Sequence, residues 1–240
     1  MSQLFRDDPY LASCPAIVTD SGDDWVVLDR TVFYATGGGQ PGDRGVLRWG
    51  NTDTAVANAV KGEAPDQVRH ILEEGAGAPP VGTSVEAEID WPRRHRLMRM
   101  HTAMHLLCSL VDGDVTGGQV GAEKSRLDFN LPAAALDKED LTARINALVD
   151  ADHPVAARWI DDEELQQRPE LVRTMSVKPP TGQGKVRLLL IGTDEAPVDL
   201  QPCGGTHVAR TGEIGRLRIA KIENKGRQNR RVNLVLEDAE

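Results

Sequence analysis

The pattern of apolar residues changes abruptly near Asp90, and this change limits what the chain can fold into. Between Ala16 and Asp90 the apolar residues occur in short runs separated by Gly, Asp and Pro, which is typical of short strands joined by tight turns. This stretch has no helical period. We therefore predict a small all-β barrel or sandwich here. The six predicted strands cover 16–19, 25–29, 45–49, 55–60, 68–72 and 85–89.

Helical spacing begins directly after this boundary. Asp90 is a suitable N-cap, and Pro92 falls in the first turn, where its missing N–H costs little. Apolar residues then recur at helical spacing as far as Asp112. Two more helices are predicted over 137–150 and 161–168, and strands over 185–191, 215–222 and 231–236. The predicted fold class is α+β: a small N-terminal β-barrel domain over 1–90, followed by an α+β domain over 91–240.

Composition narrows the class of protein. The 240 residues are 40% hydrophobic, which supports a packed core, and the formal net charge of −9 argues against a non-specific nucleic-acid binder. The N-terminal segment has no apolar h-region, and no apolar run is long enough to span a bilayer, so we expect neither a signal peptide nor a membrane span. Three widely spaced cysteines do not form a disulfide framework, so we expect a cytoplasmic protein.

Two pairs of residues have the spacing of metal ligands. His101 and His105 lie four residues apart on the predicted helix, which places both imidazoles on one face. Cys203 and His207 flank two glycines that allow a tight turn. A thiolate and three imidazoles suit Zn²⁺ best. Cys108 is an alternative ligand on the same helix face, although its leucine neighbours favour a buried apolar role.

Two well-known functional motifs, that of the zinc proteases and that of dinucleotide-binding proteins, do not apply to this chain. Thr102 stands where a zinc protease motif HExxH has its glutamate, so that reading is excluded. The segment 37–42, GGGQPG, formally matches GxGxxG, but Pro41 interrupts it and a strand follows, so we reject a dinucleotide site. Two readings of this segment stay open: a flexible turn, or a loop that approaches a ligand closely.

Basic side chains gather in two stretches. Residues 91–100 contain four arginines and no acid, and residues 221–231 contain five bases against one glutamate. Arginine suits bidentate contact with phosphate, but such clusters are commonly only solvated surfaces. The stretches therefore indicate either a solvated face or a nucleic-acid surface.

Five segments, in this order, carry a resemblance to a known family. They are FYATGGGQPGDRG, HTAMHLL, SRLDF, PCGGTHV and IENKGRQNRRV. Over roughly residues 16–236 the chain resembles AlaX, the free-standing relatives of the editing domain of alanyl-tRNA synthetase. Its N-terminal part is similar to the longer type, which carries a β-barrel before the editing domain. The family usually has a proline where Ala35 or Thr36 stands here.

The resemblance implies a hydrolase that removes a wrong amino acid, serine and often glycine, from the 3′-terminal adenosine of alanine tRNA. It implies Zn²⁺ ligands at His101, His105, Cys203 and His207. It matches Gln119 with a glutamine near the amino-acid pocket. It also matches Gly37, Gly38, Gly39 and Gln40 with a glycine-rich loop near the bound acceptor end.

Physical reasoning adds roles for individual residues. An editing site that hydrogen-bonds the serine hydroxyl discriminates against alanine, which leaves those groups unpaired. Thr102 and Gln119 are our candidates for that contact and for catalysis. The side chains predicted to follow the acceptor-stem phosphates are Arg93, Arg94, Arg96, Lys225, Arg227, Arg230 and Arg231.

Two other functions stay open at this point. The chain is a tRNA- or partner-binding module if the zinc is purely structural, and four protein ligands are typical of structural sites. It is an editing enzyme for a different mischarged tRNA, such as a threonyl-type substrate, if the pocket accepts another amino acid.

Overall fold

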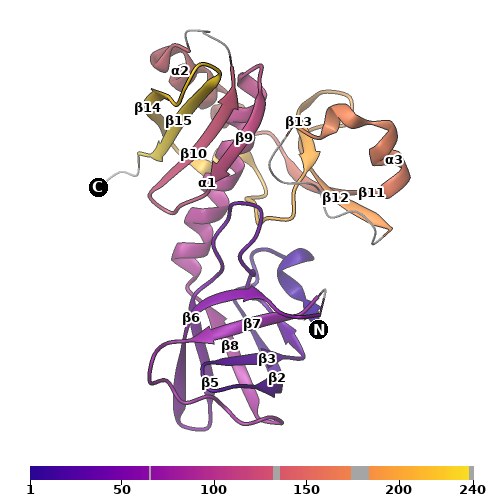
Figure 1. The fold of residues 1–240 in the computed structure, drawn as a ribbon, viewed down its shortest axis with the longest axis vertical. Helices are drawn as coiled ribbons and strands as arrows, with labels where there is room; N and C mark the ends of the chain where they lie inside the picture. Colours follow the sequence, from indigo (N-terminus) through magenta and orange to yellow (C-terminus); the bar gives the residue numbers. More distant parts are fainter. Residues whose placement is uncertain (65, 132–135, 174–183, 238–240) are drawn as a thin grey trace. The chain divides into compact units, whose positions relative to one another are not determined.

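The computed structural model describes residues 1–64, 66–131, 136–173 and 184–237 (Figure 1). The chain divides into two compact units, Met1–Arg96 and Leu97–Glu240. Among the described residues, no helix has both the length and the apolar character that crossing a membrane requires.

The first unit is a closed six-stranded barrel, which confirms the barrel predicted for this part of the chain. Its strands follow the order β2-β3-β7-β6-β5-β8, and β8 closes the barrel by pairing antiparallel with β2. A short parallel pair, β1 (Ser2–Gln3) with β4 (Arg30–Thr31), and a 3₁₀ turn over Leu4–Arg6 complete the unit. The barrel strands are β2 (Ser13–Ser21), β3 (Trp25–Leu28), β5 (Gly45–Trp49), β6 (Thr52–Lys61), β7 (Val68–Leu72) and β8 (Ser84–Ile89).

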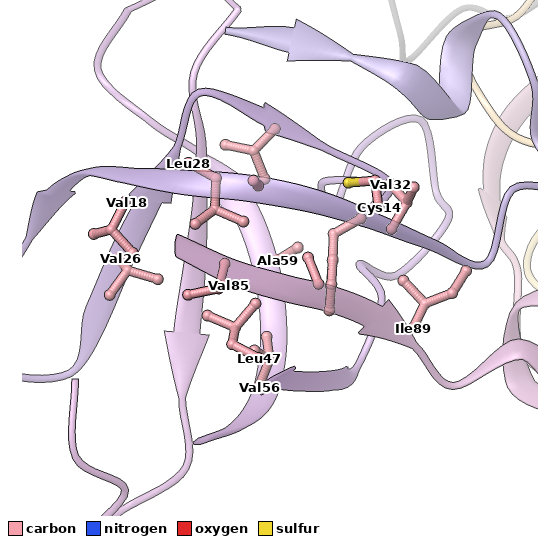
Figure 2. Packing of buried hydrophobic residues seen from close by; sticks show 14 of the residues in the cluster. Cys14, Val18, Val26, Leu28, Val32, Leu47, Val56, Ala59, Val85 and Ile89 are labelled. Atoms are coloured by element: carbon pink, nitrogen blue, oxygen red, sulfur yellow. The ribbon is translucent and has the colours of Figure 1, made fainter. Parts of the chain in front are cut away.

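Small and β-branched side chains fill the barrel (Figure 2). In β8 alternate residues Val85, Ala87 and Ile89 are buried, as expected of a strand with one face toward a core. Leu28 and Leu47 lie fully buried among them. Strand β8 thus presents one face to the barrel core, whereas the strands themselves were predicted from short apolar runs separated by Gly, Asp and Pro.

Helix α1 (Trp91–Leu110) begins in the first unit and continues through the second. The N-cap prediction is confirmed, because the Asp90 carboxylate accepts a hydrogen bond from the Arg93 N–H at 3.1 Å. Within the second unit its side chains at Leu97, Met100 and Leu107 are fully buried. The helix therefore has a fixed rotation about its axis in this unit.

Two sheets make up the rest of the second unit (Figure 1). One is four-stranded, in the order β14-β15-β10-β9, and α2 packs against it with Leu141, Ile145 and Val149 buried. The other is three-stranded, in the order β11-β12-β13, with α3 packed on one face. These elements are β9 (Asp114–Gln119), β10 (Lys124–Asn130), α2 (Lys138–Asp150), β11 (Val155–Asp161), α3 (Asp162–Gln167), η2 (Pro169–Leu171), β12 (Lys185–Gly192), β13 (Pro197–Pro202), η3 (Thr211–Ile214), β14 (Leu217–Asn224) and β15 (Asn229–Leu236).

Four of these strands were not predicted: β9, β10, β11 and β13. Strand β9 contains two adjacent glycines, and β13 has a proline at each end, so neither has strong strand propensity. Strand β10 alternates polar and apolar residues, and this signal was available in the sequence. Neighbouring strands, not local propensity, fix β9 and β13.

Candidate metal centre

Helix α1 places the first ligand pair. His101 and His105 lie one turn apart, with ring centroids 5.4 Å from each other, and both are buried. Because the helix buries apolar residues on either side of them, both imidazoles are held toward the protein interior. The predicted HxxxH spacing thus gives two convergent rings.

The second pair lies in the turn that follows β13. The Arg187 guanidinium donates to the carbonyl oxygens of Cys203 and Gly205, at 2.7 and 3.2 Å, and so holds this turn. The Cys203 sulfur lies 3.2 Å from His207 Nε2 and 3.6 Å from His101 Nε2. The turn therefore brings a thiol and a third imidazole to the two histidines of α1.

The four side chains form one cluster that could hold a metal ion. The ligand atoms of His101, His105, Cys203 and His207 all lie within 4.8 Å of one another. Three imidazoles and a thiolate are a donor set that zinc favours, so the residues fit the ion that the sequence predicted. Within the described part of the chain, Cys108 is not a member of this cluster, and its side chain is buried.

The pKa values of three side chains in the cluster, His105, Cys203 and His207, are shifted strongly from their usual ranges. Burial alone would lower the pKa of His105, but the charges of Cys203 and Asp199 outweigh it and raise that pKa to about 10. Burial would raise the pKa of the Cys203 thiol, but the three histidines lower it well below its usual range. Burial lowers the pKa of His207 to about 3. The metal-free cluster thus pairs a thiolate with an imidazolium.

Sequence reasoning missed Asp199, the hydrogen-bond partner of His105, and Gln201, which supports Asp199. Asp199 accepts a hydrogen bond from His105 Nδ1 at 2.8 Å, and the Gln201 amide donates to both Asp199 oxygens, at 3.0 and 2.8 Å. A carboxylate behind a ligand histidine fixes its ring and tautomer. A signal for them existed, because Asp199, Gln201 and Cys203 alternate along the chain and therefore share one face of a strand.

The structure corrects the prediction that Thr102 contacts a serine substrate. Its hydroxyl is fully buried, donates to the Met98 carbonyl at 2.9 Å, and lies 3.2 Å from His207 Nδ1 and 3.3 Å from the Val208 N–H. A hydroxyl has one donor and two acceptor positions, so these three partners use all of them. Thr102 instead fixes the His207 ring with Nε2 toward Cys203.

The structure does not bring Gln119 to the cluster. Gln119 is exposed at the end of β9, and its amide oxygen accepts from Arg126 Nε at 3.3 Å. A Cβ at the preceding Gly118 would meet Met104 of α1, so by strand alternation the Gln119 side chain is on the opposite face of the sheet. Its role in the amino-acid pocket stays a prediction.

The structure also corrects the prediction that Arg94 contacts phosphate. Its side chain is fully buried, and its Nε lies 3.0 Å from both carboxylate oxygens of Asp43. Further guanidinium hydrogen bonds go to the carbonyls of Pro9 and Val32. All of these hydrogen bonds are to residues of the first unit. The Arg94 charge is therefore paired with Asp43 inside the protein and is not available to phosphate. Neighbouring Arg93 is half-buried and donates to the Gly42 carbonyl at 2.9 Å.

Asp43 also organises the glycine-rich loop. Its carboxylate accepts the Tyr34 N–H at 2.6 Å, and the Tyr34 hydroxyl donates to the Gly37 carbonyl at 2.8 Å. Gly38 and Gly39 both have positive φ and form the tip of a tight turn closed by hydrogen bonds between Gly37 and Gln40. Gly38 and Gly39 are exposed, whereas Gln40 is buried. The loop is an ordered turn, and its contact with an acceptor end stays a prediction.

The second basic stretch forms the hairpin between β14 and β15. Lys225 and Arg227 are exposed, and Lys225 pairs with Glu223 at 3.6 Å. Arg230 donates to the Gly226 carbonyl at 3.0 Å, and Arg231 forms two hydrogen bonds to Asp128, at 2.7 and 2.9 Å. The charges of Arg231 and Lys225 are thus partly neutralised by carboxylates, but Lys225, like Arg227, is exposed to solvent.

The barrel unit and the unit that holds the cluster each match a domain of aminoacyl-tRNA synthetases. Residues 11–93 match the family described as tRNA synthetases class II (A). Residues 186–233, which include Cys203 and His207, match the threonyl and alanyl tRNA synthetase second additional domain. Fold and site therefore define a protein built from domains that also occur in the threonyl and alanyl tRNA synthetases.

Similar proteins narrow this class to one family. The chain is 34% identical to the alanyl-tRNA editing protein AlaX-M of Methanosarcina acetivorans, over 98% of each chain. It is 31% identical to AlaX-L of Pyrococcus horikoshii, over 98% of this chain and 58% of that protein. It is 38% identical to the alanine–tRNA ligase of Pyrobaculum aerophilum, of which it spans about a quarter, 25%. The chain belongs to the alanyl-tRNA editing proteins, AlaX, as the sequence motifs predicted.

Proposed function

We propose that this chain hydrolyses Ser-tRNA(Ala), and also Gly-tRNA(Ala), at the ester of the 3′-terminal adenosine, in the cytoplasm. As a member of the AlaX family it is an aminoacyl-tRNA deacylase. The observation that carries the proposal is the buried cluster of three imidazoles and one thiol within 4.8 Å. We propose zinc as its ion because this donor set matches zinc better than harder cations.

The chain's own residues prepare the site in three ways. Asp199 and Gln201 hold His105, Thr102 holds His207, and Arg187 holds the turn that carries Cys203. When bound, zinc would supply Lewis-acid polarisation of the ester carbonyl or a lowered pKa for water. The protein keeps the His105 and His207 rings turned toward the cluster in advance, so these rings need no reorganisation at the moment of reaction.

Substrate selection follows from the chemistry of serine. A synthetase pocket built for alanine cannot strongly reject an isostere that adds a hydroxyl, nor a smaller amino acid. A second site that offers hydrogen bonds to that hydroxyl reverses the preference, and Gln119 stays our candidate for this contact. Lys225, Arg227 and Arg230 would follow acceptor-stem phosphates, with Gly37–Gly39 near the acceptor end.

The decisive experiment compares deacylation of Ser-tRNA(Ala) and Ala-tRNA(Ala) by the intact protein and by Cys203→Ala. We expect rapid loss of serine alone, and no hydrolysis by a folded Cys203→Ala protein that has lost its zinc. Circular dichroism and zinc content control for folding and metal loading. If the zinc-loaded wild type hydrolyses neither substrate, the protein is a tRNA-binding module with a structural zinc. If it hydrolyses another mischarged tRNA instead, the proposed substrate is wrong.

A further inference from the structure

One aromatic side chain of the second unit is not used by the core. Trp159 on β11 is 51% exposed, and no other aromatic residue in the described part of the chain has comparable exposure. Strand β11 lies at the edge of the three-stranded sheet. A tryptophan left on the surface contributes little to folding and offers a large flat contact area.

The register of the sheet connects Trp159 to the metal cluster. Trp159 pairs with Arg187 on β12, and the Arg187 carbonyl accepts a hydrogen bond from the Cys203 N–H at 3.1 Å. The three residues therefore form one row across the sheet, with their side chains on the same face. Two strand spacings of about 4.8 Å place Trp159 roughly 10 Å from Cys203 along this row.

This face of the sheet is the one that meets the cluster. Asp199 projects from it to reach His105, and Gln201 on the same face donates to Asp199, while the opposite face packs against α3 through Leu188 and Leu165. Along the row, Trp159 is exposed and Arg187 is half-buried. At its far end, the Cys203 sulfur contacts the cluster. The row therefore leads from solvent at the sheet edge to the metal ligands.

Resting on the proposed function, we propose that Trp159 stacks on the 3′-terminal adenine of the bound tRNA. The acceptor end is single-stranded, and proteins bind unpaired bases by stacking them on aromatic side chains. The ester to be cut is attached to the ribose of that same nucleotide. With the ester at the cluster, the base is separated from it by one ribose, a span that matches the roughly 10 Å from Cys203 to Trp159 along the row.

A double-mutant cycle on the full-length, metal-loaded protein tests this contact. Two uncharged acceptor-stem RNAs, one ending in CCA and one ending in CC, are titrated into wild type and Trp159→Ala at fixed salt. Stacking of about 1–3 kcal/mol corresponds to a fivefold to 150-fold change in Kd. We expect Trp159→Ala to weaken binding of the CCA end by this factor and of the CC end hardly at all. In deacylation, KM should rise with little change in kcat.

Two variants separate stacking from other effects. Trp159→Phe keeps an aromatic face and should restore most of the affinity. Arg158→Ala removes a neighbour on the same strand whose side chain is on the other face, and it should leave both RNAs unaffected. Equal losses for the two RNAs, or no loss, would overturn the stacking contact while leaving deacylation intact. A wild type that hydrolyses no mischarged tRNA overturns the proposed function instead, whatever the cycle shows.

Discussion

Each unit of the molecule buries an aspartate, and the two aspartates serve different ends. In the barrel unit, Asp43 faces the permanently charged Arg94, and the pair is completed by neighbouring backbone groups. In the second unit, Asp199 faces His105, whose ring belongs to the metal cluster. The first network is closed on itself and anchors a loop. The second orients an imidazole of a cluster that could hold a metal ion. The partner of the buried carboxylate therefore differs between the units: a permanent cation in one, and a candidate metal ligand in the other.

Removing Arg94 should have the largest effect. Arg94→Ala leaves the Asp43 carboxylate buried without its cation, and such losses cost about 3–5 kcal/mol. We expect the free energy of unfolding, measured by urea titration, to fall by that amount. The matched control is Arg48→Ala, which removes a surface ion pair with Glu88 whose side chains are 44% and 43% exposed. That control should cost at most about 1 kcal/mol. Similar losses in the two variants would contradict the role assigned to Arg94.

Removing Asp199 should act on metal affinity. Loss of a carboxylate behind a ligand histidine typically lowers metal affinity 10–100-fold. The zinc affinity of Asp199→Ala, measured by competition with a chelator, should therefore fall by about that factor. Gln201→Ala, which removes only the support of the carboxylate, should show a smaller loss. Asp194→Ala is the control, because its side chain is 71% exposed and pairs with Arg158. If Asp199→Ala keeps the zinc affinity of the wild type, Asp199 has only a structural role, as Asp43 does.

Proton release on metal binding tests whether Asp199, unlike Asp43, acts on a metal ligand. The pKa of His105 is raised to about 10 in the metal-free protein, above its ordinary value near 6.5. This shift stabilises the metal-free fold fully below pH 6.5, and the contribution is lost as pH rises toward 10. A metal ligand must be a neutral imidazole, so binding at pH 8 should release about one proton.

Calorimetry in two buffers with different ionisation enthalpies measures that proton. Cys203 and His207 should add none, because the pKa of the thiol is well below its usual range and that of His207 is about 3. Asp199→Ala should reduce the release, since Asp199 helps to raise the pKa of His105. Release of no proton by the wild type would show that His105 is already neutral.

Sequence patterns revealed what is local and missed what is long-range. Short apolar runs separated by Gly, Asp and Pro predicted the barrel, and the spacing of His101 with His105 and of Cys203 with His207 predicted residues that the structure brings together. The same reasoning assigned Arg94 to phosphate and Thr102 to substrate, because the sequence alone does not show whether a charged group or a hydroxyl is buried or exposed. Their partners, Asp43 and His207, lie 51 and 105 residues away, and only the fold identifies them.

The smallest expected effect concerns the arginines and lysines that remain on the surface. Unlike Arg94, Lys225 and Arg227 are exposed, so their charges are available to phosphate. Each phosphate contact contributes about −0.9 to the slope of log K against log salt concentration on duplex nucleic acid. Lys225→Ala and Arg227→Ala should each flatten the measured slope for tRNA binding by about that amount, whatever the tRNA sequence. Arg216→Ala is the control, because it removes an exposed arginine outside the hairpin that pairs with Asp150. If all three variants keep the wild-type slope, the hairpin is a solvated surface, and the buried arginine and the exposed ones are alike in making no contact with tRNA.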